Sequence, residues 1–199
     1  YPFMGLRSFL FTKRSYTPIP IVIIILFFSD QTQSFLYIGF LLIAIGEAIR
    51  FNAVRYAGGR TRTTKVGANK LCISGPYAYT RNPLYIGNLF IYCGVVLLSG
   101  GPYLLQLFFI VVAYFVFQYS MIISLEEDKL LTIFGKDYLD YKMNVPRLFP
   151  LLRAWDNKKR SKPFPLKKTL FTEKRTLQNI IIIIFIILIK PIALNIFFN

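Results

Sequence analysis

The sequence of 199 residues contains no histidine. This absence excludes acid–base catalysis by imidazole and metal sites that depend on histidine ligands. Cysteine is almost as rare: Cys72 and Cys93 form neither a CxxC pair nor a disulfide framework. We interpret both as buried thiols, and we expect no metal site in this protein. The GxGxxG, Walker, HExxH and GxSxG motifs are also absent from the sequence.

Acidic residues are scarce, with 9 Asp and Glu against 24 Lys and Arg, so the formal net charge is +15. Such a basic chain binds nucleic acid or anionic lipid headgroups. Because 55% of the residues are hydrophobic and several apolar runs approach the ~20 residues that cross a bilayer, the sequence predicts an integral membrane protein. Anionic lipid headgroups are therefore the expected partner, and nucleic acid is not.

The apolar runs predict an all-α, polytopic bundle of about five transmembrane helices. They cover residues 16–28, 35–54, 83–99, 103–125 and 177–198, the last broken at Lys190-Pro191. With the N-terminus in the cytoplasm, all Lys and Arg residues except Lys190 fall on the inner side, where such residues accumulate. The two long inner segments, residues 55–82 and 126–175, are the expected location of an active site on the cytoplasmic side.

The stretch "SGPYAYTRNPLYIGN", residues 74–88, carries polar groups into the third apolar run. Asn82-Pro83 is a helix-start signature, with Asn expected to cap the first amides, and a helix N-terminus attracts anions. Tyr85, Asn88 and Tyr92 then fall on one face, which predicts a stripe that faces protein or a cavity. An interfacial aromatic belt is an alternative for Tyr77 and Tyr79.

The stretch from Ser124 to Pro150 places Glu126 and Glu127 where the fourth apolar run ends. Negative charge at a helix C-terminus is unfavourable, so we expect a compensating cation from arginines or from a ligand. Apolar and aromatic residues beyond the pair repeat with a helical period, which predicts an amphipathic cytoplasmic helix interrupted at Gly135. These residues are Leu130, Phe134, Tyr138 and Tyr141.

The second apolar run contains Glu47 and Arg50, whose i, i+3 spacing predicts an ion pair within the membrane. Gly39 and Gly46 in the same run permit close helix packing. The basic sequence "RTRTTK" at residues 60–65, together with Arg55 and Lys70, is typical of a patch that binds lipid headgroups.

Four of these pieces, in this order, resemble the isoprenylcysteine carboxyl methyltransferase and phospholipid methyltransferase superfamily of membrane enzymes. They are "GEAIRFNAVRYAGG", "GPYAYTRNPLYIGN", the acidic pair "EE" and "FGKDYLDYKMNVPRLFP". The resemblance covers about residues 39–150. It implies a single integral membrane domain over 1–199, with a methyltransferase-like core at 35–150 and a basic cytoplasmic segment plus an apolar helix at 151–199.

The resemblance also implies a methyltransferase that uses S-adenosylmethionine and acts on a lipophilic substrate entering from the bilayer, either a carboxylate of the isoprenylcysteine kind or another lipid carboxylate or amine. Arg147, Arg81 and Glu127 are the expected catalytic residues, because a carboxylate acceptor needs no general base, only a cation such as Arg147 or Arg81 to orient it. The residues implied to contact the cofactor are Tyr77, Arg81, Asn82, Tyr85, Gly87, Glu126, Glu127, Tyr138 and Tyr141.

One position departs from the family pattern, because Asn82 stands where the family has histidine. Asparagine donates and accepts hydrogen bonds, so cofactor binding is compatible with this change, whereas a role that needs imidazole protonation is not. Two alternatives stay open at this point. The "FGKDY" segment is similar to that of NADPH-dependent membrane sterol reductases, and a non-catalytic lipid-binding membrane protein also fits the loss of histidine.

Overall fold

The computed structural model describes residues 2–30, 35–58, 67, 70–155 and 161–198, with the side chains of 2–4 and 194–198 left out. Within these residues the chain is all-helical and contains no β-strand, which confirms the predicted fold class. The elements are α1 (Pro2–Lys13), α2 (Ile19–Phe28), α3 (Leu36–Ala57), the short 3₁₀-helix η3 (Gly75–Ala78), α4 (Pro83–Ser99), α5 (Leu104–Phe134), α6 (Lys136–Asn144) and α7 (Leu166–Phe198). The predicted headgroup patch at "RTRTTK" lies outside the described residues.

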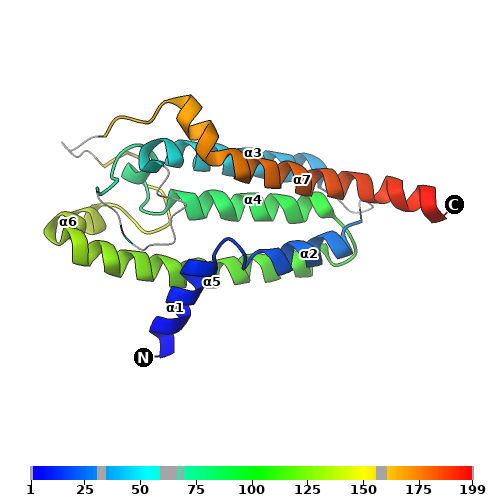
Figure 1. Ribbon diagram of the computed structural model, residues 1–199, viewed down its shortest axis with the longest axis horizontal. Helices are drawn as coiled ribbons and strands as arrows, with labels where there is room; N and C mark the ends of the chain where they lie inside the picture. The colour runs from blue at the N-terminus through cyan, green and yellow to red at the C-terminus, as the bar shows by residue number, and fades with distance from the viewer. Residues whose placement is uncertain (1, 31–34, 59–66, 68–69, 156–160, 199) are drawn as a thin grey trace.

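Five helices, α2, α3, α4, α5 and α7, run along the long axis of the molecule, while α1 projects from the bundle and α6 lies at one end (Figure 1). Three of them, α3, α5 and residues 166–193 of α7, are long and apolar enough to cross a membrane. Two shorter apolar helices, α2 and α4, accompany them. The protein is therefore an integral membrane protein, and the count of about five spans stays a prediction.

Glycines bring α3 and α4 into close contact, as predicted for Gly39 and Gly46. A Cβ atom added to Gly46 would lie 2.6 Å from the carbonyl oxygen of Gly87, and one added to Gly94 would lie 2.6 Å from that of Gly39. The two pairs are seven residues apart on each helix, so both fall on one face. Small residues at such positions allow backbones to approach in membrane helices, which explains how α3 and α4 pack without a space between them.

Replacing Gly46 by alanine is expected to destabilise the protein by about 1–3 kcal/mol, because the new methyl group overpacks the contact with Gly87. The same substitution at Gly5 in α1 is the matched control, since nothing lies within 4 Å of a Cβ at that position. Both variants gain the same helix propensity of about 1 kcal/mol, so their difference isolates the steric cost. Unfolding in detergent micelles measures both, and equal stabilities would show that α3 and α4 are not in tight contact.

Two helices differ from their predicted limits. The fourth apolar run was expected to end at Leu125, but α5 continues to Phe134, so Glu126 and Glu127 lie inside a helix rather than at its C-terminus. The helix stops only at Gly135, whose φ of 50° favours glycine. The expectation that the pair opposes a helix end is therefore wrong, because the helix continues for seven residues beyond Glu127, to Phe134.

The final helix is also longer than predicted. It begins at Leu166 instead of residue 177, and it is not broken at Lys190-Pro191, because Pro191 lies within α7. Proline is tolerated in membrane helices where neighbouring groups satisfy the backbone that it disrupts. The early start places eleven more residues on α7 and brings polar side chains of this helix beside α3.

Candidate functional site

A cavity of about 840 Å³ lies inside the bundle and is lined by residues from the α1–α2 turn and from α2, α3, α4, α5, α6 and α7. Its size falls within the range typical of pockets for drug-sized ligands and cofactors. Most of the site residues suggested by the sequence line it, and they come from segments far apart in the chain. These residues are Tyr77, Arg81, Asn82, Tyr85, Glu126, Glu127, Tyr138 and Tyr141.

Two of the suggested residues, Gly87 and Arg147, are not among the lining residues. Gly87 is buried in the contact between α3 and α4, where an added Cβ would lie 2.7 Å from the carbonyl oxygen of Gly46. We therefore assign Gly87 to helix packing. Arg147 pairs with Glu127, which does line the cavity, at 2.8 Å.

Glu127 is held between two arginines. Arg81 donates to Glu127 Oε1 from Nε and Nη2, at 3.1 and 2.9 Å, and Arg147 donates from Nη2 to Oε2 at 2.8 Å. The carboxylate is only 5% exposed. The compensating cations expected from the sequence are therefore these arginines, and the cluster joins the start of α4, the last third of α5 and the segment after α6.

Arg81 has little hydrogen-bonding capacity left for a ligand. Besides Glu127, its Nη1 atom donates to the carbonyl oxygens of Lys142 and Val145, at 2.9 and 2.6 Å. A guanidinium has five N–H groups, and four hydrogen bonds are accounted for. Arg81 thus ties α4 to the end of α6, and we assign it a positioning role instead of the carboxylate-orienting role that the sequence suggested.

Glu126 has a different environment, although it is the neighbour of Glu127. Its Oε2 atom accepts a hydrogen bond of 3.0 Å from the hydroxyl of Tyr85, and the side chain lines the cavity. This contact joins the third and fourth apolar runs at the level of the site. Arg14, from the turn between α1 and α2, also lines the cavity and interacts electrostatically with Glu126. The cavity therefore presents one carboxylate and one guanidinium close together.

Asn82 occupies the N-cap position of α4, as predicted, but its side chain makes no capping hydrogen bond. Its Nδ2 atom instead donates to the carbonyl oxygen of Arg147 at 3.0 Å. The prediction that Asn82 caps the helix amides is therefore wrong, because the amide group turns toward the segment after α6. The first turn of α4 still faces the cavity through Leu84 and Tyr85.

Three tyrosines form the wall of the cavity next to α6. The hydroxyl of Tyr141 donates to the carbonyl oxygen of Tyr77 at 2.7 Å, and the rings of Tyr138 and Tyr141 lie 6.2 Å apart. Burial raises the pKa of Tyr77, Tyr138 and Tyr141 well above the usual range. These hydroxyls stay protonated at neutral pH, so they can shape a pocket but are poor general bases.

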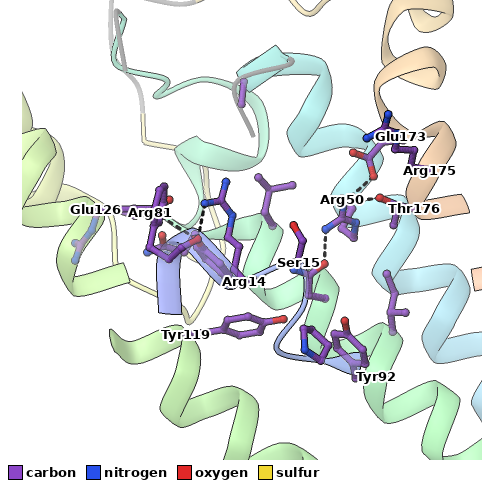
Figure 2. A pocket seen from close by; sticks show the side chains of 18 of the residues that line it. Arg14, Ser15, Arg50, Arg81, Tyr92, Tyr119, Glu126, Glu173, Arg175 and Thr176 are labelled. Atoms are coloured by element: carbon purple, nitrogen blue, oxygen red, sulfur yellow. Dashed lines mark hydrogen bonds and ion pairs between the residues drawn. The ribbon is translucent and has the colours of Figure 1, made fainter. Parts of the chain in front are cut away.

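A second buried polar cluster lies across the cavity, on α3, α4 and α7. Arg50 Nη2 donates to Glu173 Oε2 at 2.7 Å, and Arg50 Nη1 donates to Asn88 Oδ1. The predicted ion pair with Glu47 is present, at 3.7 Å from Arg50 Nε. Figure 2 shows Arg50, Glu173 and Thr176 on one side of the cavity, Arg81 and Glu126 on the other side, and Arg14 between them.

Two residues of the site, Glu173 and Arg14, are not predicted from the sequence. Glu173 was assigned to a basic connector, because the apolar signal of the last helix begins only at Leu177. Extending the helical period backward by four residues from Leu177 reaches Glu173 and indicates it as part of the helix. Arg14 lies outside the motifs that carry the family resemblance, and nothing local to it in the sequence indicates that its turn closes a cavity.

Glu173→Gln is expected to lower the stability of the protein by roughly 1–3 kcal/mol, because the fully buried carboxylate ties α7 to Arg50 of α3. The neighbouring substitution Lys174→Gln is the matched control, since Lys174 is exposed on the same helix turn. Thermal unfolding in detergent measures both variants. A Glu173→Gln protein as stable as the Lys174→Gln protein would show that the ion pair does not attach α7.

The comparisons with known proteins agree with this architecture. The family model described as "Phospholipid methyltransferase" matches residues 35–137, just over half of the chain. No solved structure matches the chain. Several curated relatives are named protein-S-isoprenylcysteine O-methyltransferase, from animals and from yeasts.

The relative from Mus musculus is 30% identical over 121 residues, which are 58% of this chain and 41% of that protein. The relative from Saccharomyces cerevisiae is 30% identical over 122 residues, 59% of this chain and 50% of that protein. The one from Schizosaccharomyces pombe is 32% identical over 119 residues, 58% of this chain and 48% of that protein. The matched part spans half or less of each relative's length. Because this family model matches more than half of the chain, including helices that carry the site, the chain belongs to the phospholipid methyltransferase family.

Proposed function

We propose that this protein is a methyltransferase that binds S-adenosylmethionine in the central cavity and methylates a lipophilic acceptor, at the cytoplasmic surface of the membrane. The observation that carries the proposal is the hydrogen bond between Tyr85 and Glu126, at 3.0 Å, which joins the two resembling motifs on the wall of one cavity. The names of the relatives, protein-S-isoprenylcysteine O-methyltransferase, support an acceptor of the prenylated carboxylate kind.

The residues present fit the charges of this cofactor. Glu126 suits an ammonium group, and Arg14 on the adjacent wall suits a carboxylate, so the pair matches the zwitterionic amino acid moiety. The N-terminal turn of α4 adds a partly positive field on the same side. The rings of Tyr77, Tyr85 and Tyr138 suit a sulfonium cation and an adenine ring. When bound, S-adenosylmethionine supplies a methyl group that is already activated for displacement.

The protein's own residues then have mainly to position the acceptor and exclude water. Arg50 also lines the cavity, but its guanidinium is already paired with Asn88, Glu173 and Glu47, so it holds α3, α4 and α7 together around the acceptor. A carboxylate acceptor needs no general base, which agrees with the lack of histidine and with the raised pKa of Tyr77, Tyr138 and Tyr141. Arg81, Glu127 and Arg147 hold the helix ends in place around the cavity.

The orientation of the chain follows from the same charges. Lys and Arg residues accumulate in the cytoplasmic segments of membrane proteins, and Arg14, Lys70 and Arg81, which line the polar end of the cavity, belong to the segments predicted to lie on that side. We therefore place the N-terminus and the site on the cytoplasmic side. Anionic headgroups at this surface are the proposed lipid partners of the exposed lysines at the start of α7, such as Lys167, Lys168 and Lys174.

Calorimetry on the protein in detergent tests the proposal, with S-adenosylmethionine and NADPH titrated separately. We expect binding of S-adenosylmethionine only, followed by transfer of labelled methyl groups to N-acetyl-S-farnesylcysteine or to a lipid of the membrane extract. Binding of NADPH alone would instead support a reductase. Binding of neither compound would support a lipid-binding protein without catalysis.

A further inference from the structure

The cavity changes character along its length. On α4 its lining residues run from Asn82, Tyr85 and Asn88 to Ile91 and Val95. At 1.5 Å per residue, the distance from Asn82 to Val95 is about 20 Å, and the stretch beyond Asn88 is about 10 Å. The site therefore has a polar half that faces Glu126 and an apolar half that extends toward the other end of the bundle.

The walls of the apolar half come from α2 and α7, on either side of α4. Helix α2 contributes Ile19, Val22 and Ile23, and α7 contributes Ile180, Ile182 and Ile183. Ile23 and Ile182 are also 60% and 54% exposed on the outside of the bundle. These walls therefore reach the surface that faces lipid, and the apolar half is a slot between two membrane helices.

Two isoleucines close the slot. Ile25 lies three residues beyond Val22 on α2, and Ile187 lies four residues beyond Ile183 on α7, so each continues the face that lines the cavity. Both are 0% exposed, both belong to the main core cluster, and neither lines the cavity. Ile25 and Ile187 thus form the floor of the slot.

Lys190 holds this floor in place. Its Nζ atom donates to the carbonyl oxygens of Leu26, Phe27 and Ser29, at 2.9, 2.7 and 2.9 Å, at the C-terminal end of α2. Carbonyls at a helix end lack partners within the helix, and a lysine inside a membrane is costly unless it is paired. Separating α2 from α7 at this level would break all three hydrogen bonds, so the floor resists displacement by a long chain.

We infer that the slot between α2 and α7 receives the hydrocarbon chain of the acceptor, and that Ile25 and Ile187, fastened by Lys190, limit the length of chain that it accepts. The inference rests on the proposed function for the identity of the acceptor. It adds the specificity-determining residues, and it places them on two helices outside the segment that matches the family model.

Photolabelling with fatty acids that carry a terminal diazirine tests this inference without any methyl transfer. Octanoic, dodecanoic and hexadecanoic probes place their carboxylate at the arginines that line the polar half of the cavity, such as Arg14, and their reactive end in the slot. In the native protein we expect labelling of cavity residues such as Val22 and Ile183 to fall at least tenfold from the best probe to the longest one. In Ile187→Ala the optimum is expected to move to a longer probe, because the floor is removed.

Leu98→Ala is the matched control, because Leu98 is equally buried but packs against Gly39 at the contact between α3 and α4. Its labelling profile should equal that of the native protein. Lys190→Met should broaden the profile toward longer probes, and Ile187→Val keeps the test open if the alanine variant does not fold. An unchanged optimum in the variants of Ile187 and Lys190, or labelling only on the outer face of α2 and α7, would overturn the inference. Binding of S-adenosylmethionine is measured separately, so failure of the slot and failure of the proposed function are distinguishable.

Discussion

Replacing Glu126 by glutamine is expected to weaken binding of S-adenosylmethionine by roughly 10- to 100-fold while the protein stays folded. Glutamine keeps the shape of the side chain, and its amide oxygen still accepts the hydrogen bond from Tyr85. The substitution removes the negative charge of Glu126, which we propose binds the ammonium group of the cofactor. Calorimetry in detergent measures the affinity, and circular dichroism with thermal unfolding establishes that the fold is retained.

Asp128→Asn is the matched control for this experiment. Asp128 lies two residues further along α5, has a side chain that is 72% exposed, and pairs with Arg7 at 3.4 Å outside the cavity. This substitution removes the same charge from the same helix, so it should leave the affinity within about twofold of the native value, as expected for an exposed ion pair. Equal affinities of the Glu126→Gln and Asp128→Asn proteins would contradict the assignment of Glu126 to the cofactor.

Glu127→Gln is expected to act on stability, and to lower the free energy of unfolding by about 3 kcal/mol. The substitution leaves the guanidinium of Arg81, whose side chain is 9% exposed, without its anionic partner. This loss in the free energy of unfolding lies at the low end of the range for a broken buried ion pair, because the side chain of Arg147 is 41% exposed and regains contact with water. Denaturation in mixed micelles measures the change.

A double-mutant cycle with Arg81→Met separates this interaction from the general cost of each substitution. If the ion pair holds the start of α4 against α5, the double variant should be more stable than the sum of the two single changes predicts. Strict additivity would mean that Glu127 and Arg81 do not stabilise each other, and that the cluster has another role. A large loss of cofactor affinity in a fully stable Glu127→Gln protein would likewise contradict the structural role.

Local signals in the sequence predicted some elements accurately. Helix α4 begins at Pro83 and ends at Ser99, as predicted, because Asn-Pro favours a helix start and two glycines follow its last residue. Close packing of α3 was also predicted, since Gly39 and Gly46 recur at a helical interval within an apolar run, but the sequence did not indicate α4 as the partner. The presence of Tyr77, Tyr85 and the acidic pair around one cavity agrees with the resemblance that suggested them.

Other features depend on information that is not local. The predicted end of α5, at Leu125, lies nine residues before its true end at Phe134. Glu126 and Glu127 mark a change in polarity, and such a change marks the limit of an apolar run rather than the end of a helix. The hydrogen bond between Arg50 and Glu173 joins residues 123 positions apart. A periodicity argument compares only neighbouring turns, so it could not assign these partners or show that Arg81 is already committed to Glu127.

The close contact between α3 and α4 has a consequence for the geometry of the site. Arg50 follows Gly46 by four residues, and Asn88 comes directly after Gly87, so the two side chains meet because the glycines fix how the helices align. One residue inserted between Gly46 and Arg50 would rotate the guanidinium by about 100° around the axis of α3. Gly46 and Gly87 thus determine the direction of the Arg50 side chain, because the absence of their own side chains sets how α3 and α4 align.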